Sequence, residues 1–301
     1  LNLEAFPERD NANKRVFQGA KMSVCILNMM VGINKPNLTL RTHWDRFVDK
    51  ENELVNITLD NIKNIDSENY SIPILVSKDL KVLDKIYSVE SRLGDFSHCY
   101  AGEIDLTIAR KYITSNENDS LLIKGAILNK YLIKDKMSQG EIEYLDSEYY
   151  LSENKSKKSL HHKHKRIAMQ AITGVNEKFR LKMTIINENI FCGNSVNYIV
   201  FNDSNISLKA MLGILNSRLV NYVFSKSSSN SNVNGYEINN LPIPQLSINK
   251  EAPLVELVNQ ILNKKNIGSD TTSLEKKVDI LVYKLYNLTE EEIQIVESSI
   301  D

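Results

Sequence analysis

The chain has 301 residues and a mass of 34.4 kDa; 42% of its residues are hydrophobic and 25% are charged. This composition is typical of a globular protein and excludes a disordered tail, a collagen-like rod and a pure coiled coil. The 37 Lys and Arg residues nearly balance the 38 Asp and Glu residues, so a polyanion could bind only to a local basic patch. Three widely spaced cysteines without a CxxC pair argue against a disulfide framework and favour a cytoplasmic protein. No apolar run approaches the roughly 20 residues of a membrane span, so no membrane partner is expected.

The first 70 residues are predicted to form strands. Residues 24–27 are apolar on both faces, as in a strand buried between two layers. Residues 37–44 alternate between polar and apolar, and a glycine and a proline separate the two segments. The pattern predicts a hairpin-like pair at one edge of a sheet. From Pro73, apolar residues at helical spacing predict a connector helix that ends near Gly94.

Helices are predicted again in the last third of the chain. Apolar residues over 207–224 follow the spacing of one helix. Asn216 and Ser217 are unfavourable inside a helix, so we expect a side-chain hydrogen bond there that docks the helix on the domain. The tail is helical as well, and Thr289 with Glu292 predicts a capping box at the start of the last helix.

The middle of the chain carries the strongest charge asymmetry. Residues 141–154 hold five acids and no Lys or Arg, whereas residues 155–182 hold nine Lys and Arg against Glu177 alone. Arg166 and Gln170 are four residues apart, so they share a face in a strand or in a helix. Their side chains match the edges of guanine and adenine as bidentate pairs. The pattern is compatible with DNA contact, and also with a solvated charged surface, which is what most charge runs are.

Downstream, Arg180, Lys182 and Thr184 alternate with apolar residues. A strand there would bury one face and present a cationic row to phosphates on the other. Such a row is the second reason to expect a polyanion site in this region.

Motifs for catalysis are missing from the sequence. His161, His162 and His164 have no Cys or carboxylate partner at a metal-ligand spacing, so no metal site is expected. Glu153 and Lys155 fit the short end of a metal-dependent nuclease motif, with Asp135 or Asp146 upstream, but we interpret the match as chance. There is no glycine-rich phosphate loop, no GxSxG and no HExxH, and no catalytic residue is assigned.

Four segments, in their order along the chain, resemble the C-terminal half of adenine-specific DNA methyltransferases of the TaqI-like group, especially fused Type IIG restriction-modification enzymes. The segments are 5–10 with 14–24, 164–172 with 180–182 and 194–198, 215–219 with the extended 241–244, and 281–286 with 288–292. The glycine-containing S-adenosylmethionine motif and the Asn-Pro-Pro-Tyr motif of that group do not occur here. Both precede the matching segment in the group, so the resemblance implies that the catalytic half is absent from a chain that opens at Leu1.

The resemblance implies an α+β fold with four parts. These are the end strands of a methyltransferase α/β core (1–70), a connector helix (71–95), a mixed α/β target-recognition domain (96–248) and a C-terminal helical tail (249–301). The implied function is sequence-specific recognition of duplex DNA, so that the absent half can methylate a flipped adenine. The implied partners are double-stranded DNA and the N-terminal catalytic part of the same protein. No cofactor is expected in this fragment, whereas the parent enzyme would use S-adenosylmethionine, and magnesium if a nuclease is fused.

The resemblance also suggests which residues contact DNA. Phe6 lies in a Phe-Pro pair that in this group supplies a ring stacked on the flipped adenine, which recovers part of the cost of extruding the base. The remaining DNA-binding candidates are basic or polar: Lys163, His164, Lys165, Arg166, Gln170, Arg180 and Lys182, with Lys124 and Lys130 as loop contacts.

Two other functions remain open from the sequence. The first is a protein-interaction or scaffold module that docks a methyltransferase partner through the C-terminal helices. The second is a self-sufficient nuclease built on Glu153 and Lys155.

Overall fold

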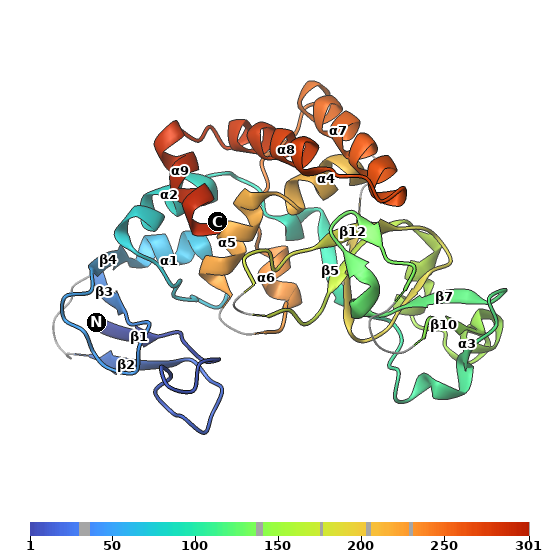
Figure 1. The fold of residues 1–301 in the computed structure, drawn as a ribbon, viewed down its shortest axis with the longest axis horizontal. Coiled ribbons are helices and arrows are strands. Elements are labelled where there is room, and N and C mark those ends of the chain that lie inside the picture. Colours follow the sequence, from blue (N-terminus) through green and yellow to red (C-terminus); the bar gives the residue numbers. More distant parts are fainter. Residues whose placement is uncertain (30–36, 137–140, 175–176, 203–205, 229–230, 301) are drawn as a thin grey trace.

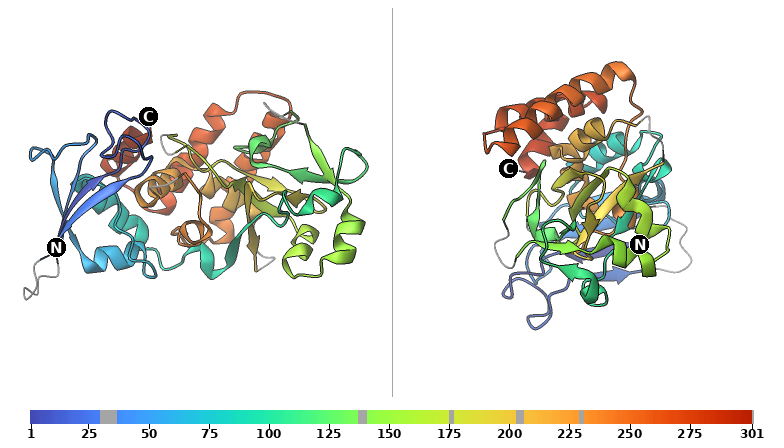
Figure 2. Two further views of the ribbon diagram at one scale, coloured as in Figure 1. Left: turned by 90° about the horizontal axis from the view of Figure 1, so that it is seen from below. Right: turned by 90° about the vertical axis from the view of Figure 1, so that its right-hand side faces the viewer.

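A computed structural model describes residues 1–29, 37–136, 141–174, 177–202, 206–228 and 231–300. The molecule is elongated, with a sheet at each end of its long axis and a third sheet between them (Figures 1 and 2). The C-terminal helices lie along one side of the molecule. Helices and small sheets are mixed along the chain, so the predicted α+β class is confirmed.

The N-terminal sheet has the strand order β2-β1-β3-β4. Its strands are β1 (Asn2–Phe6), β2 (Val24–Asn28), β3 (Asn37–Thr42) and β4 (Leu54–Thr58). β1 is parallel to β3, and the other two pairs are antiparallel. Because β1 lies between β2 and β3, the predicted hairpin of residues 24–27 with 37–44 is wrong.

Strand β2 was also expected to be buried, and that expectation is wrong for this chain. It forms one edge of the sheet, and Cys25, Ile26 and Leu27 are exposed. A strand with apolar residues on both faces is normally buried between two layers, but no described residue covers β2. The consequence is an apolar strand with a free edge.

Two helices follow the N-terminal sheet: α1 (Leu59–Ile65) and α2 (Ser77–Tyr87). The predicted connector helix corresponds to α2, which ends before Gly94. That glycine lies in a separate short turn, η1 (Leu93–Asp95). The later short 3-10 helices are η2 (Ala109–Tyr112), η3 (Gly125–Ile127) and η4 (Lys158–Lys163).

The central sheet is antiparallel, with the order β12-β11-β14-β5. Its strands are β5 (Ser97–Ala101), β11 (Arg166–Gln170), β12 (Met183–Ile186) and β14 (Val196–Phe201). Alternation along β11 sends Ile167 and Met169 into the core shared with the helices, and Ala168 into a second core on the opposite face. The sheet is therefore buried on both sides.

A smaller sheet, β13-β7-β10-β6, lies at the far end of the molecule (Figure 1). Its strands are β6 (Ile113–Thr114), β7 (Ser120–Ile123), β10 (Glu143–Leu145) and β13 (Phe191–Cys192). Beside it are a two-stranded ribbon of β8 (Leu128–Asn129) and β9 (Leu132–Ile133) and the helix α3 (Ser147–Glu153).

Residues 207–224 form two helices, so the prediction of one continuous helix is wrong. α4 (Leu208–Leu215) ends at Asn216, and α5 (Arg218–Ser227) begins after Ser217. The Ser217 hydroxyl caps α5 by accepting from the Val220 N–H at 3.2 Å. Asn216 exchanges two 2.9 Å hydrogen bonds with the backbone of Met183 in β12. The predicted docking through a side chain is thus confirmed.

The remaining helices are α6 (Gly235–Asn239), α7 (Ile248–Asn266), α8 (Thr272–Leu285) and α9 (Glu290–Ile300). The predicted capping box is present, because the Thr289 N–H donates to Glu292 at 2.7 Å and the Glu292 N–H donates to the Thr289 hydroxyl at 3.3 Å. Within the described residues no helix is long and apolar enough to cross a membrane.

Candidate nucleic-acid interface

Three consecutive basic residues, Lys163, His164 and Lys165, form an exposed segment, called here the 163–165 segment. It leaves η4 and enters β11, and its side chains line a hollow of about 580 Å³ together with Glu188 and Phe201. Neither lysine forms an ion pair with any residue that the structure describes. The segment therefore presents two lysines without ion pairs to solvent, although Glu188 lines the same hollow.

Arg166, one residue further, does not belong to this exposed surface. Its side chain is fully buried (0% exposed) and donates to the Glu103 carboxylate at 2.9 Å and to the carbonyl of Ile190. The guanidinium lies 4.6 Å from the centre of the Tyr198 ring. This corrects the expectation of a base contact from Arg166, because in this structure its donors are directed at groups of the protein.

Gln170 shares the face of Arg166, as its spacing predicts, but it too is turned toward the protein. Its amide donates to the Leu128 carbonyl at 3.2 Å. A base contact from this half-buried residue would require that hydrogen bond to open.

The cationic row expected from Arg180, Lys182 and Thr184 is not formed. Arg180 is buried and donates to the carbonyl of Ser228 at 3.0 Å, and burial lowers the pKa of its guanidinium. Lys182 pairs with Glu177 at 2.6 Å. Thr184 is buried as well, because β12 packs against the helices on one side and a second core on the other. Charge alternation alone was a poor guide to the exposed face here.

The two loop lysines expected near DNA are also paired within the chain. Lys124 lies 2.7 Å from Glu143, and Lys130 lies 2.7 Å from Glu275 of α8. Burial alone would raise the pKa of Glu275, but the charge of Lys130 holds it below its usual value. These lysines contribute little net positive charge to the surface.

Phe6 ends β1 with its ring stacked on His43, at a centroid distance of 4.9 Å and an interplanar angle of 28°. The ring is only 4% exposed, and the residue lines a hollow of about 460 Å³ with Pro7, Tyr70 and Tyr236. One ring face is thus occupied by a protein side chain. Stacking of Phe6 on a flipped adenine stays a prediction.

The histidines and the nuclease-like triplet have structural partners. His162 stacks on Phe191 in the core, and His161 lies 3.0 Å from the Tyr198 hydroxyl. Burial lowers the pKa of His161, which keeps its ring uncharged near neutral pH. Glu153 pairs with Lys111 at 2.6 Å, and the described residues contain no group of three potential metal ligands.

Sequence reasoning missed a second hollow next to the 163–165 segment. Lys165 lines both hollows, and Thr184 and Lys209 line the second one. One signal was available in the sequence: Ser207 caps α4, and Lys209 follows in the first turn, where a cation opposes the helix dipole.

The family comparison matches residues 120–243 to the model described as the TaqI-like C-terminal specificity domain. Residues 120–243 are thus similar to a TaqI-like specificity domain, and this range is called the specificity domain from here on. The 163–165 segment lies within this domain, whereas Phe6 lies outside it. A comparison with curated proteins gives no match.

Among solved structures, the Type IIL restriction-modification enzyme MmeI, in complex with DNA, matches at a TM-score of 0.51 and 9% identity. The match covers 99% of this chain and 45% of that one, so this chain spans less than half the length of MmeI. The Type IIG restriction endonuclease BpuSI matches at a TM-score of 0.42 and 13% identity, and the match covers 95% of this chain and 43% of the BpuSI chain. The match with MmeI shows that this chain shares the fold of a part of that enzyme.

Proposed function

We propose that this chain is the part of a restriction-modification enzyme that recognises double-stranded DNA in a sequence-specific manner. The observation that carries the proposal is the TaqI-like specificity domain at residues 120–243, with an exposed and unpaired basic segment inside it. The fold shared with MmeI, which was solved in complex with DNA, supports the same function. Phosphate contacts from Lys163 and Lys165 would position the duplex without reading its sequence.

We assign adenine methylation to another part of the protein. Among the described residues no glycine-rich turn leads from a strand into a helix, which is the cradle that S-adenosylmethionine would need in such a core. The described residues also offer no cluster of ligands for a magnesium ion. S-adenosylmethionine would supply the methyl group, and this chain would hold the duplex in place.

Strand β2 supports the proposal that a catalytic part attaches to the N-terminal sheet. One edge of β2 has no neighbouring strand among the described residues, and Ile26 and Leu27 are 53% and 49% exposed on opposite faces. A strand that is apolar on both faces is stable when further strands continue the sheet and helices cover it. We infer that the sheet continues from this edge into the catalytic part.

Duplex binding by the 163–165 segment can be tested with fluorescence anisotropy over a series of salt concentrations. Each phosphate neutralised adds about 0.9 to the slope of log affinity against log salt. We expect Lys163→Gln and Lys165→Gln each to reduce that slope by about 1, on specific and random duplexes alike.

The matched control is Lys276→Gln, which removes an exposed lysine of α8 far along the chain from the specificity domain. It should leave the slope unchanged. Absence of duplex binding by the wild-type chain at low salt would refute the proposed function, and equal slopes in all variants would refute the role of the segment.

A further inference from the structure

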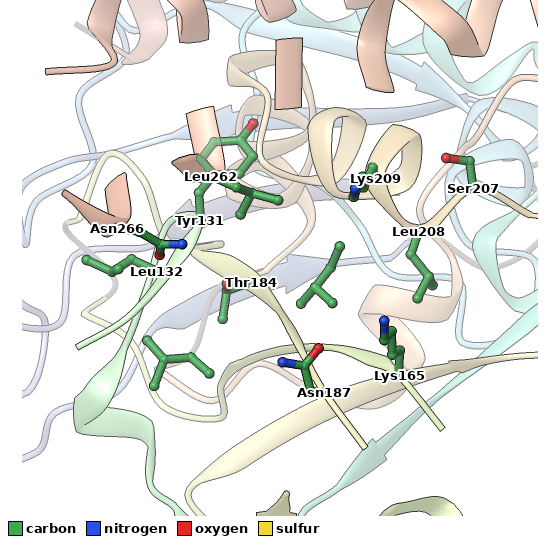
Figure 3. Close-up of a pocket in the computed structure, with 12 residues that line it drawn as sticks. Tyr131, Leu132, Lys165, Thr184, Asn187, Ser207, Leu208, Lys209, Leu262 and Asn266 are labelled. Carbon is green, nitrogen blue, oxygen red and sulfur yellow. The ribbon is translucent and has the colours of Figure 1, made fainter. Parts of the chain in front are cut away.

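The second hollow has a volume of about 520 Å³ and lies between β12 and the helices α4 and α7. Lys165 and Asn187 approach it from one side, and Ser207 and Lys209 from the other, with Thr184 between them (Figure 3). Within the part of the chain that the structure describes, no Asp or Glu lines this hollow. Two ammonium groups without a facing carboxylate favour an anion there and disfavour a cation.

Thr184 gives an independent indication of a ligand. The residue is only 3% exposed, yet it lines the hollow, and its hydroxyl makes no hydrogen bond to any described residue. The side chain is thus almost entirely enclosed by protein, and a group in the hollow can supply the hydrogen bond that the described residues do not. Asn187 and Asn266 also line the hollow, and both side chains are exposed and available to a ligand.

The start of α4 adds backbone donors to the same place. The Ser207 hydroxyl accepts from the Ala210 N–H at 3.3 Å, so the cap leaves the N–H groups of Leu208 and Lys209 for another acceptor. Lys209 lies in the first turn, where its charge opposes the helix dipole. An anion bound between this turn and Lys165 would compensate both lysines and the dipole.

We propose that this hollow binds a phosphate group, held by Lys165, Lys209 and the Thr184 hydroxyl at the first turn of α4. The group could be carried by the backbone of duplex DNA or by a free mononucleotide, and the chemistry of recognition is the same. The apolar side chains that line the rest of the hollow, Leu132, Ile185 and Leu262, fit the sugar or base attached to it. Only the duplex source rests on the proposed function.

The test uses the full chain and two kinds of probe. Binding of inorganic phosphate and of 5′-AMP is measured by isothermal titration calorimetry, with adenosine as the uncharged reference, and binding of a labelled duplex by anisotropy. Lys209→Gln and Lys165→Gln should each lower the affinity for the probe that binds, AMP or duplex, about tenfold. Thr184→Val keeps the shape of a buried side chain, so the protein should stay folded while the same affinity falls several-fold. Lys264→Gln, at an exposed position of α7 that does not line the hollow, should have no effect.

The outcomes separate the two sources. Saturable binding of AMP that Lys209→Gln weakens, with unchanged duplex affinity, supports a nucleotide. Weakened duplex affinity in Lys209→Gln, without AMP binding, supports a backbone phosphate. If phosphate and AMP do not bind and no variant changes duplex affinity, the hollow is not a phosphate site, even where the wild-type chain binds DNA. If the duplex does not bind but AMP does, the proposed function fails and the phosphate site stands.

Discussion

Individual charged residues in this chain divide into those that hold the fold and those that face solvent, and only contacts distant in sequence separate the two classes. Arg166 and Lys165 are neighbours, but the first is buried against Glu103 and the second is exposed. The partner of Arg166 lies 63 residues away, so the charge pattern from which the DNA-binding candidates were chosen could not reveal it.

We expect Arg166→Met to reduce the free energy of unfolding by about 3–5 kcal/mol, because Glu103 would remain buried without a counter-charge. Urea unfolding followed by circular dichroism measures the loss. The double variant Arg166→Met/Glu103→Leu should recover most of it. If Arg166→Met is as stable as the wild-type chain but loses discrimination at one base pair of the duplex, Arg166 contacts a base after all.

Asp279 of α8 should make stability depend on pH. Burial raises the pKa of its carboxyl to about 6 from an ordinary value of 3.8, although the Arg218 N–H donates to it at 2.8 Å and Lys130 lies nearby. Because the folded protein binds this proton more tightly, the free energy of unfolding should fall by about 3 kcal/mol as the pH rises from about 4 to about 6, and then stay level. Asp279→Asn should flatten that part of a stability profile measured by urea unfolding; an unaltered profile would contradict the assignment.

Helices and strands were predicted correctly where the sequence signal lay within the element itself. The capping box of Thr289 and Glu292 and the three C-terminal helices needed only neighbouring residues to be predicted. The break between α4 and α5 was missed because apolar spacing continues through it, while Ser217 acts as a cap and Asn216 reaches β12. The burial of β2 was missed for the opposite reason: composition reports what a strand prefers, and not what covers it.

The junction of α4 and α5 predicts a large effect for a single amide. We expect Asn216→Ala to leave the buried N–H of Met183 without a partner, at a cost of about 1–3 kcal/mol, whereas the Met183 carbonyl keeps its 2.9 Å hydrogen bond from the Tyr131 N–H. Thermal unfolding should show a lower Tm for this variant. Asn263→Ala, at an exposed position of α7, is the control and should leave the Tm unchanged.

At the scale of the whole molecule, the N-terminal sheet carries an apolar strand that the described residues leave open. Met22, Ile26, Leu27 and Met29 are each about half exposed or more. Edge strands of this kind pair with other chains when their normal neighbour is missing.

The division of the chain at residues 70, 95 and 248 stays a prediction.

We therefore expect the isolated chain to self-associate with rising concentration, as measured by analytical ultracentrifugation. Ile26→Lys should suppress the association and leave duplex affinity unchanged, because β2 lies outside residues 120–243. A chain that stays monomeric at all concentrations would argue against an open edge in solution.

The alternative function as a scaffold requires apolar surface on the C-terminal helices, and much of that surface is used inside this chain. Val282 and Tyr283 of α8 belong to the main core, and Val296 of α9 joins the same core. Docking of a partner through these helices stays a prediction without support from their packing.

The packing of the C-terminal helices also limits which segment could be transplanted into a related protein. Lys130 of the specificity domain is paired with Glu275 of α8, and the Tyr286 hydroxyl donates to the Pro242 carbonyl at 2.6 Å. Further along, Glu292 of α9 holds Lys85 of α2 at 2.7 Å. A graft of residues 120–243 alone would sever the first two contacts, so the smallest segment that keeps them together extends through α8 to Tyr286.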